Sequence, residues 1–172
     1  MKMMNAALNK QGGISLIEVL VAVLVLAIGL LGVAGLQSAS LKNSTDVYFG
    51  QQAMTYSQDL INRIMANRDA ASTGDYADDP PASEPAKNCS SEACTSAEVA
   101  DWDLWQWSQD LTNGFGAPPS AAASVAWANA TGEYTIAITW DAEGLGDDYE
   151  APTCTADDNE SRGCLFTAYR VM

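Results

Sequence analysis

The feature that most constrains this chain is an apolar stretch of 23 residues, from Ile14 to Leu36, in which Glu18 is the only charged residue. As a helix that rises about 1.5 Å per residue, the stretch spans about 35 Å, more than the roughly 30 Å thickness of a bilayer's hydrocarbon core. The apolar part of a cleaved secretory signal is shorter, about 7 to 15 residues. The length therefore predicts a membrane-spanning helix.

Basic residues flank this stretch unequally. Lys2 and Lys10 precede it, and the next basic residue on the other side is Lys42. Because positive charge is retained on the cytoplasmic side, the N-terminus is predicted to be cytoplasmic and the remainder of the chain to lie outside the inner membrane.

Glu18 lies unusually deep for a carboxylate. A charge within a membrane segment costs a few kcal/mol, and such residues commonly have a functional partner. If the chain is cut after Gly13, the new amine of Ile14 lies one helical turn from Glu18. The alternative is that Glu18 stays solvated at the headgroup boundary.

The residues around this carboxylate resemble a known signal. The class III signal of type IV prepilins and pseudopilins is similar to the run Gly13-Ile14-Ser15-Leu16-Ile17-Glu18-Val19-Leu20. The resemblance implies that prepilin peptidase cuts after Gly13 and methylates the amine of Ile14, and that Glu18 acts in subunit assembly. The family's usual first mature residue is Phe, which Ile14 replaces here.

A narrower resemblance covers residues 16–37 and 58–68, which are similar to the PilV branch of minor pilins. It implies a pilin-like α+β fold, with a long N-terminal helix packed on a small antiparallel sheet. The implied partners are other minor pilins, the major pilin, prepilin peptidase, the inner membrane and the pilus assembly platform. The implied location is the inner membrane, with a periplasmic C-terminal domain, and then the pilus.

The predicted organisation has four parts. Residues 1–13 are a cleaved leader, 14–36 the membrane and filament-core half of the long helix, 37–68 its amphipathic half, and 69–172 the globular domain. Val47, Met54 and Ile61, seven residues apart, and a second group at Leu60, Ile64 and Met65 predict the face that docks on this domain. Asp59 and Arg63 are spaced for an ion pair on the helix surface.

The globular part is predicted to begin with a proline-containing surface loop over 69–96. Thr95-x-x-Glu98 is a capping box that opens a helix running to Leu111 and stopping at Gly114. Alternation predicts strands at 134–140 and 165–172, with a weaker third strand at 125–128.

Four cysteines lie beyond the membrane segment, in an oxidising compartment, and predict two disulfides with three possible pairings. The local pairs, Cys89 with Cys94 and Cys154 with Cys164, are favoured because each closes a short loop. A zinc site is the alternative, but the spacing from Cys154 to Cys164 does not suit it.

Charge and composition limit the classes of function that this chain can have. The net charge is −14, and loss of Lys2 and Lys10 with the leader leaves 6 basic against 22 acidic residues, or −16, which disfavours nucleic acid. The chain has no histidine, so no enzyme, catalytic residue, cofactor or metal site is predicted. Two alternatives remain: calcium bound by the acidic loop 141–163, and glycosylation at Asp157-x-Asn159-x-Ser161.

The predicted function is therefore that of a minor pilin, a structural subunit that primes or supports pilus assembly, with a place at the tip as one option. The alternatives are a minor pseudopilin of a type II secretion system, a pilus-tip adhesin and a conventionally cleaved secreted protein.

Overall fold

The computed structural model describes residues 15–115, 121–142, 145–148, 150–151, 153–158 and 163–171 of the chain. By its internal contacts the chain forms two compact units, Met1–Leu41 and Lys42–Met172. The leader residues, Gly13 and Ile14, and the Asn159 and Ser161 positions of the glycosylation motif lie outside the described residues.

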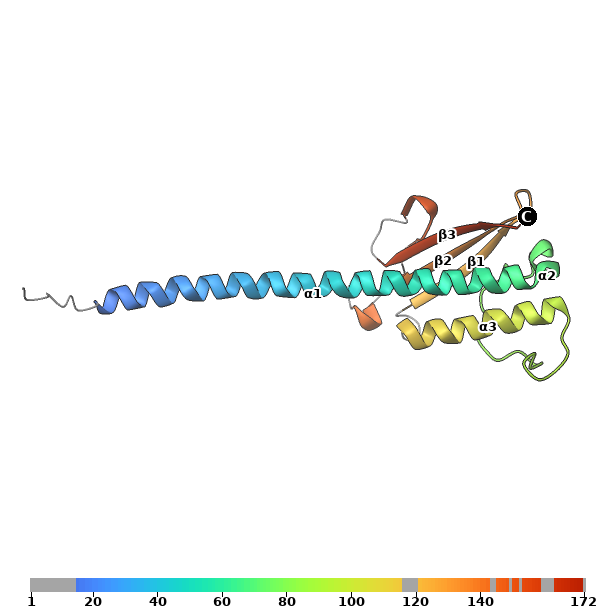
Figure 1. Cartoon of the computed structure of the whole chain (residues 1–172), viewed down its shortest axis with the longest axis horizontal. Coiled ribbons are helices and arrows are strands. Elements are labelled where there is room, and N and C mark those ends of the chain that lie inside the picture. Colours follow the sequence, from blue (N-terminus) through green and yellow to red (C-terminus); the bar gives the residue numbers. More distant parts are fainter. Residues whose placement is uncertain are drawn as a thin grey trace, which may run out of the picture. The chain divides into compact units, whose positions relative to one another are not determined.

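Helix α1 runs from Leu16 to Ala66 (Figure 1). No proline interrupts it, since the first proline is Pro80, and an acidic Glu18 in the first turn and a basic Arg63 in the last suit the helix dipole. A short helix α2, Arg68–Thr73, follows and ends at Gly74, which has a left-handed φ of 88°. The prediction that residues 69–96 form only a loop was therefore wrong over 69–73, where an alanine-containing segment free of proline continues as helix.

The buried face of α1 also differs from the predicted one. It consists of Ala53, Ser57, Leu60, Ile61 and Ile64, whereas Val47, Met54 and Met65 are each more than half exposed. Ala53 and Ser57 are small, so they allow neighbouring elements to approach the helix closely. A prediction built on large apolar side chains misses such positions.

Helix α3 spans Ser96–Phe115, and its buried residues are Ala100, Trp102, Leu104, Trp107 and Leu111. Gly114 lies inside the helix, contrary to its predicted role as the stop. Its φ is not positive, so it does not adopt the left-handed conformation that commonly ends a helix.

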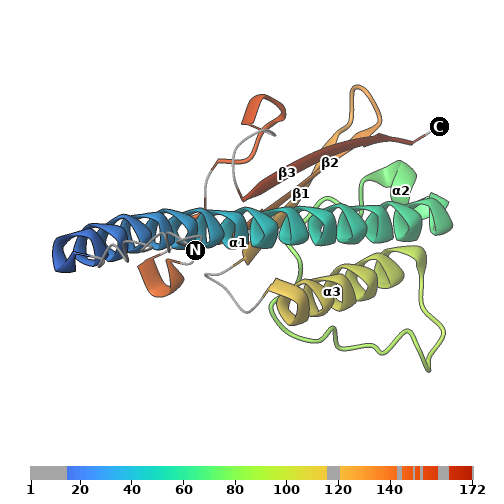
Figure 2. The same cartoon turned by 60° about the vertical axis from the view of Figure 1, so that its left-hand side comes forward.

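Three strands form one antiparallel sheet of order β1-β2-β3 (Figures 1 and 2). They are β1 Ala121–Ala128, β2 Glu133–Trp140 and β3 Cys164–Arg170, with Val125 opposite Ile136 and Ile138 opposite Leu165. The two predicted strands are confirmed, and the third begins four residues earlier than predicted. Short 3-10 turns lie at Gly146–Asp148 and Ala156–Asp158.

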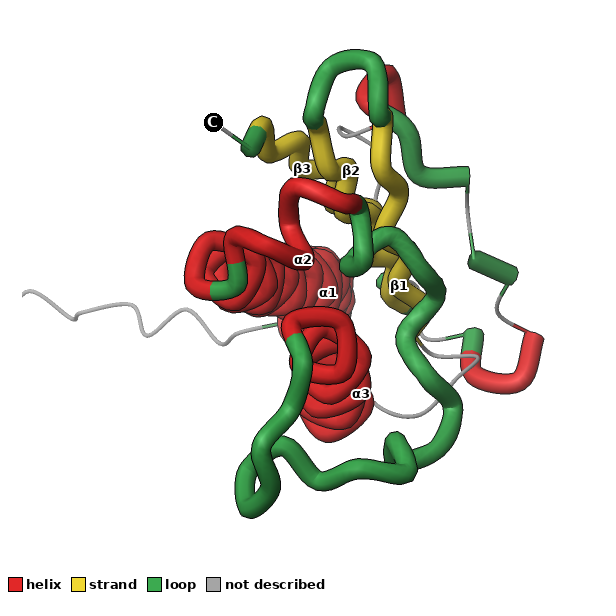
Figure 3. Tube along the Cα trace, turned by 90° about the vertical axis from the view of Figure 1, so that its right-hand side faces the viewer, coloured by secondary structure: helices red, strands yellow, loops and turns green. Residues whose placement is uncertain are grey.

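The core lies between the helices and one face of the sheet (Figure 3). Alternate β2 residues Tyr134, Ile136, Ile138 and Trp140 are buried there against Leu60 and Ile64 of α1 and Leu104 and Trp107 of α3. Disulfides join Cys89 to Cys94 and Cys154 to Cys164, the two local pairs. The predicted pilin-like α+β fold, a long N-terminal helix on a small antiparallel sheet, is confirmed.

Candidate functional site

The first unit presents α1 as an uncovered apolar surface. Every described side chain from Ser15 to Leu41 is exposed, and Leu16 and Leu36 are 80% and 74% exposed. Within α1 up to Leu41, Glu18 is the single charged residue. The helix is long and apolar enough to cross a membrane. A surface of this kind needs lipid or other helices to cover it.

Glu18 occupies the first turn of α1. Its backbone N–H donates to the carbonyl of Ser15 at 3.0 Å, and the N–H of Val19 donates to the same oxygen at 3.3 Å. The carboxylate therefore lies at the positive end of the helix, where N–H groups lack partners within the helix. Gly13 and Ile14 precede the described part of the chain, so their distance from Glu18 is not defined.

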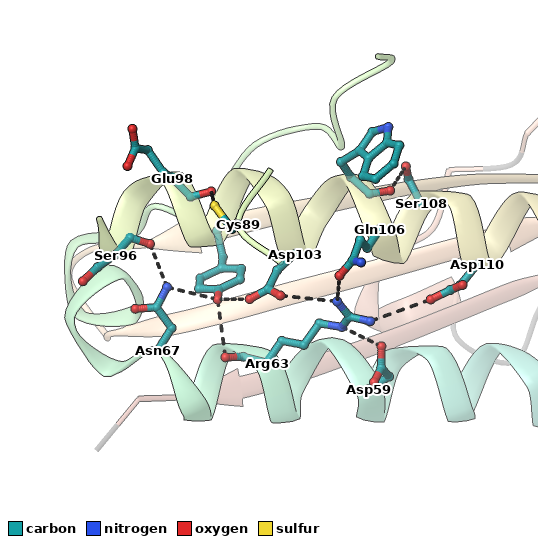
Figure 4. Close-up of polar contacts among 12 residues, drawn as sticks. Asp59, Arg63, Asn67, Cys89, Ser96, Glu98, Asp103, Gln106, Ser108 and Asp110 are labelled. Carbon is teal, nitrogen blue, oxygen red and sulfur yellow. Dashed lines mark hydrogen bonds and ion pairs between the residues drawn. The ribbon is translucent and has the colours of Figure 1, made fainter. Parts of the chain in front are cut away.

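A polar cluster at the other end of α1 joins this helix to α3 (Figure 4). The guanidinium of Arg63 lies 2.8 Å from Asp59, 3.3 Å from Asp103 and 3.7 Å from Asp110, and it donates to Gln106 at 3.2 Å. Burial would lower the pKa of Arg63, but the hydrogen bond and charge of Asp59, followed by Asp103, outweigh burial and raise it. The predicted pair of Asp59 and Arg63 is confirmed as part of a larger cluster.

Tyr76 extends the cluster into the core. Its hydroxyl is fully buried and donates to Asp103 at 2.6 Å, while Asn67 donates to that hydroxyl at 3.3 Å and to the carbonyl of Ser96 at 2.7 Å. Burial, followed by the hydrogen bond to Asp103, raises the pKa of Tyr76. Asn67, the residue between α1 and α2, thus fixes the end of α1 against the start of α3.

The start of α3 carries the predicted capping box. The carboxylate of Glu98 accepts from the backbone N–H of Thr95 at 2.8 Å, and the hydroxyl of Thr95 accepts from the N–H of Glu98 at 3.3 Å. Lys87 donates to the same carboxylate at 2.8 Å. The hydrogen bond from Lys87, followed by that from Thr95, lowers the pKa of Glu98 to about 2.

Five residues of this cluster were not predicted: Asp103, Gln106 and Asp110 of α3, Asn67 between α1 and α2, and Tyr76 after α2. Asp103, Gln106 and Asp110 are spaced i, i+3 and i+7, so they share one helix face, and that spacing was an available signal. Tyr76 and Asn67 carry no local pattern that predicts their contacts.

The described residues contain no cluster of three or more His, Cys, Asp or Glu side chains placed to hold a metal ion. Much of the acidic loop 141–163 lies outside the described part. Among the described residues, Arg63, Lys87 and Arg170 pair with carboxylates of the same chain, and the pairs of Arg63 hold α1 against α3.

Comparison with protein families gives two matches. Residues 35–105 match the family described as Type IV pilin Tt1218, and residues 8–34 match the prokaryotic N-terminal methylation motif. No curated protein and no solved structure matches the chain with significant similarity.

The two matches are consecutive and run from residue 8 into α3. The methylation motif implies processing by prepilin peptidase and partners in pilus assembly. The motif and the apolar helix that follows it place the protein in the membrane as an anchored prepilin and then in the pilus. The chain is thus a type IV pilin-like protein with an N-terminal methylation motif, a structural subunit and not an enzyme.

Proposed function

We propose that this protein is a minor pilin of the PilV branch, a low-abundance subunit that primes or supports pilus assembly. The observation that carries the proposal is the uncovered half of α1, whose only charge is Glu18. Such a helix is stored in the bilayer and can exchange lipid for the helices of other subunits without exposing its apolar surface to water.

Glu18 selects the axial register in which the helix packs against the helices of neighbouring subunits. After cleavage behind Gly13, the methylated amine of Ile14 in one subunit is the positive partner for Glu18 of a neighbour. A carboxylate left unpaired in the apolar filament core is costly, whereas the net gain from a buried pair is small. The pairing therefore rejects wrong registers more than it adds stability.

The charge of the chain supports the minor role. The processed chain carries 6 basic and 22 acidic residues. Stacking many copies of a −16 subunit against one another is opposed by like-charge repulsion. Single copies among less acidic subunits avoid this cost.

The first experiment replaces Glu18 with alanine in the producing cell. Glu18→Ala is expected to insert into the membrane and to be cleaved, but to be missing from sheared pili. Glu18→Asp keeps the charge and is expected to retain part of the incorporation, and Glu92→Ala, an exposed carboxylate in the 89–94 disulfide loop, serves as the unaffected control. Recovery of Glu18→Ala in sheared pili at the normal level contradicts the proposal.

The second experiment defines the N-terminus of the mature chain by mass spectrometry. The expected chain begins at N-methylated Ile14. Conventional signal cleavage would fall near the small residues Ala39 and Ser40. A chain that begins there lacks the apolar half of α1, which excludes any filament role for Glu18. A deletion strain that keeps its pili but loses protein secretion assigns the protein to a secretion pseudopilus instead.

A further inference from the structure

β1 forms one edge of the sheet, and that edge is open. Within the described ranges, the strand order β1-β2-β3 gives β1 one neighbouring strand, β2. Among the described residues, residues 123–127 make no backbone hydrogen bond outside the β1–β2 ladder. The strand also contains no charged residue and no proline, the features that usually block an exposed edge. In the described part of the chain, no strand other than β2 pairs with β1, so its outward N–H and C=O groups are available to an added strand.

A cleft lies beside this edge. It has a volume of about 400 Å³, and its walls come from the loop residues Asp79–Ala82, from the α3 residues Ser108, Gln109, Leu111 and Thr112, and from Ala122 and Ala123 of β1. Figure 3 shows β1 as the strand nearest the loop that connects α2 and α3. Ala123 is on the same side of β1 as the buried Val125, and its small side chain leaves room next to Leu111.

The edge and the cleft together have the two parts of a strand-addition site. In such sites the main-chain hydrogen bonds of the edge supply affinity, and a pocket that takes an alternate side chain supplies specificity. Here the cleft opens where the inward side chain of an added strand would lie.

Charge indicates the kind of occupant. Of the described residues that line the cleft, one is charged, the acidic Asp79, and none is basic. With 22 acidic against 8 basic residues in the sequence, a second copy of this chain meets like-charge repulsion. A segment with basic flanks meets attraction.

We propose that the β1 edge and this cleft bind a short extended segment of another protein, flanked by basic residues, which adds to the sheet as a fourth strand. An apolar side chain of that segment enters the cleft between Ala123 and Leu111. This site is separate from Glu18 and goes beyond the proposed function, because a pilin of any branch or a pseudopilin could use it.

The test uses the full chain in detergent micelles and an amidated peptide, Lys-Thr-Val-Thr-Val-Thr-Val-Lys, labelled for fluorescence anisotropy. The peptide is expected to bind. Two further peptides carry N-methyl groups on alternate amides, one on the odd-numbered and one on the even-numbered residues. The peptide whose methylated amides face β1 is expected to bind about tenfold more weakly, and the other to bind as the parent does. Replacing both lysines with glutamates is expected to weaken binding at low salt. No binding at about 1 mM peptide, or equal binding of both N-methylated forms, overturns the proposal.

Two variants locate the site on the chain. Ala123→Leu fills the cleft and is expected to weaken peptide binding about tenfold, whereas Ala126→Leu adds the same atoms on the opposite face of β1 and is expected to leave it unchanged. Far-ultraviolet circular dichroism checks that both variants fold, and the N-methylated peptides test the edge even if Ala123→Leu does not. Equal effects of the two variants place the peptide elsewhere. A concentration-dependent dimer that Ala123→Leu abolishes assigns the edge to a second copy and also overturns the proposal. A loss of pilus incorporation in Glu18→Ala has no bearing on these outcomes.

Discussion

The indole Nε1 of Trp107 donates a hydrogen bond of 2.8 Å to the backbone carbonyl of Tyr56, which joins α3 to α1. Trp107 is fully buried, so the bond fixes both the rotation and the height of α3 on the long helix. Since an indole N–H must find an acceptor when it is buried, this contact is also demanding about geometry.

Trp107→Phe is expected to lower the free energy of unfolding by about 1–3 kcal/mol, because it removes this hydrogen bond and leaves a cavity. The measurement is urea unfolding of the full chain in detergent, followed by near-ultraviolet circular dichroism. Trp105→Phe is the control, since Trp105 is only half-buried. An equal loss of unfolding free energy in both variants would mean that the hydrogen bond to Tyr56 adds no measurable stability.

Asp103→Asn tests the cluster around Arg63. Asp103 accepts from Tyr76 at 2.6 Å and pairs with Arg63 at 3.3 Å, and its side chain is only 18% exposed. Loss of its charge is expected to cost about 1–3 kcal/mol. The matched control is Asp110→Asn, whose side chain is 54% exposed and 3.7 Å from Arg63, with an expected cost below about 0.5 kcal/mol. The same unfolding assay compares them, and a larger effect at Asp110 would refute this ranking.

Stability is expected to depend on pH through Glu98. Its pKa in the folded chain is about 2, against 4.5 for an unperturbed Glu, so the unfolded state binds a proton first as the pH falls. The stabilisation is therefore fully present above about pH 5 and lost progressively towards about pH 2. Glu98→Gln is expected to make the urea midpoint depend less on pH between about pH 2 and pH 5. Glu92→Gln is expected to leave that pH dependence unchanged. Parallel curves for the native chain and Glu98→Gln would exclude Glu98 as the source.

Gly163 is expected to tolerate no side chain. Its φ is 76°, and a Cβ there would overlap the carbonyl oxygen of Trp140, whose N–H donates to the carbonyl of Gly163 at 2.9 Å. Gly163→Ala is expected to cost more than about 2 kcal/mol. Gly146→Ala, at a φ of 62° with nothing within 4 Å, carries the conformational cost alone, about 1 kcal/mol. Thermal unfolding of the two variants separates overlap from backbone conformation, and similar melting temperatures would show that the overlap is relieved at no cost.

Local signals predicted much of the fold. The length of the apolar stretch indicated the helix that became the first half of α1, the alternation from Tyr134 to Trp140 indicated β2, and Thr95 with Glu98 marked the start of α3. Each of these depends on residues that are close in the sequence, where hydrogen-bond partners and side-chain direction follow from the backbone period.

Two errors had a common origin. Val47 and Met54 were assigned to the docking face by their size, but the structure buries Ala53 and Ser57 instead. Gly114 was read as a helix stop, but it stays helical next to Tyr56, whose hydroxyl fills the space where a Cβ would lie. In both cases the packing of elements that are distant in the sequence decided which residue is buried or helical.

The sequence by itself determined the class of this protein: a basic N-terminal segment, an uninterrupted apolar helix with one carboxylate, a continuation of that helix and a small strand-forming domain. Only the tertiary structure decided that Asp103 lies between Arg63 and Tyr76, that Trp107 reaches the carbonyl of Tyr56, and that β1 lies at the end of the described sheet beside a cleft. The physical reason is the separation along the sequence over which each kind of interaction acts. Helix and strand periods act over a few residues, whereas these contacts join positions tens of residues apart, and their geometry exists only once the core has packed.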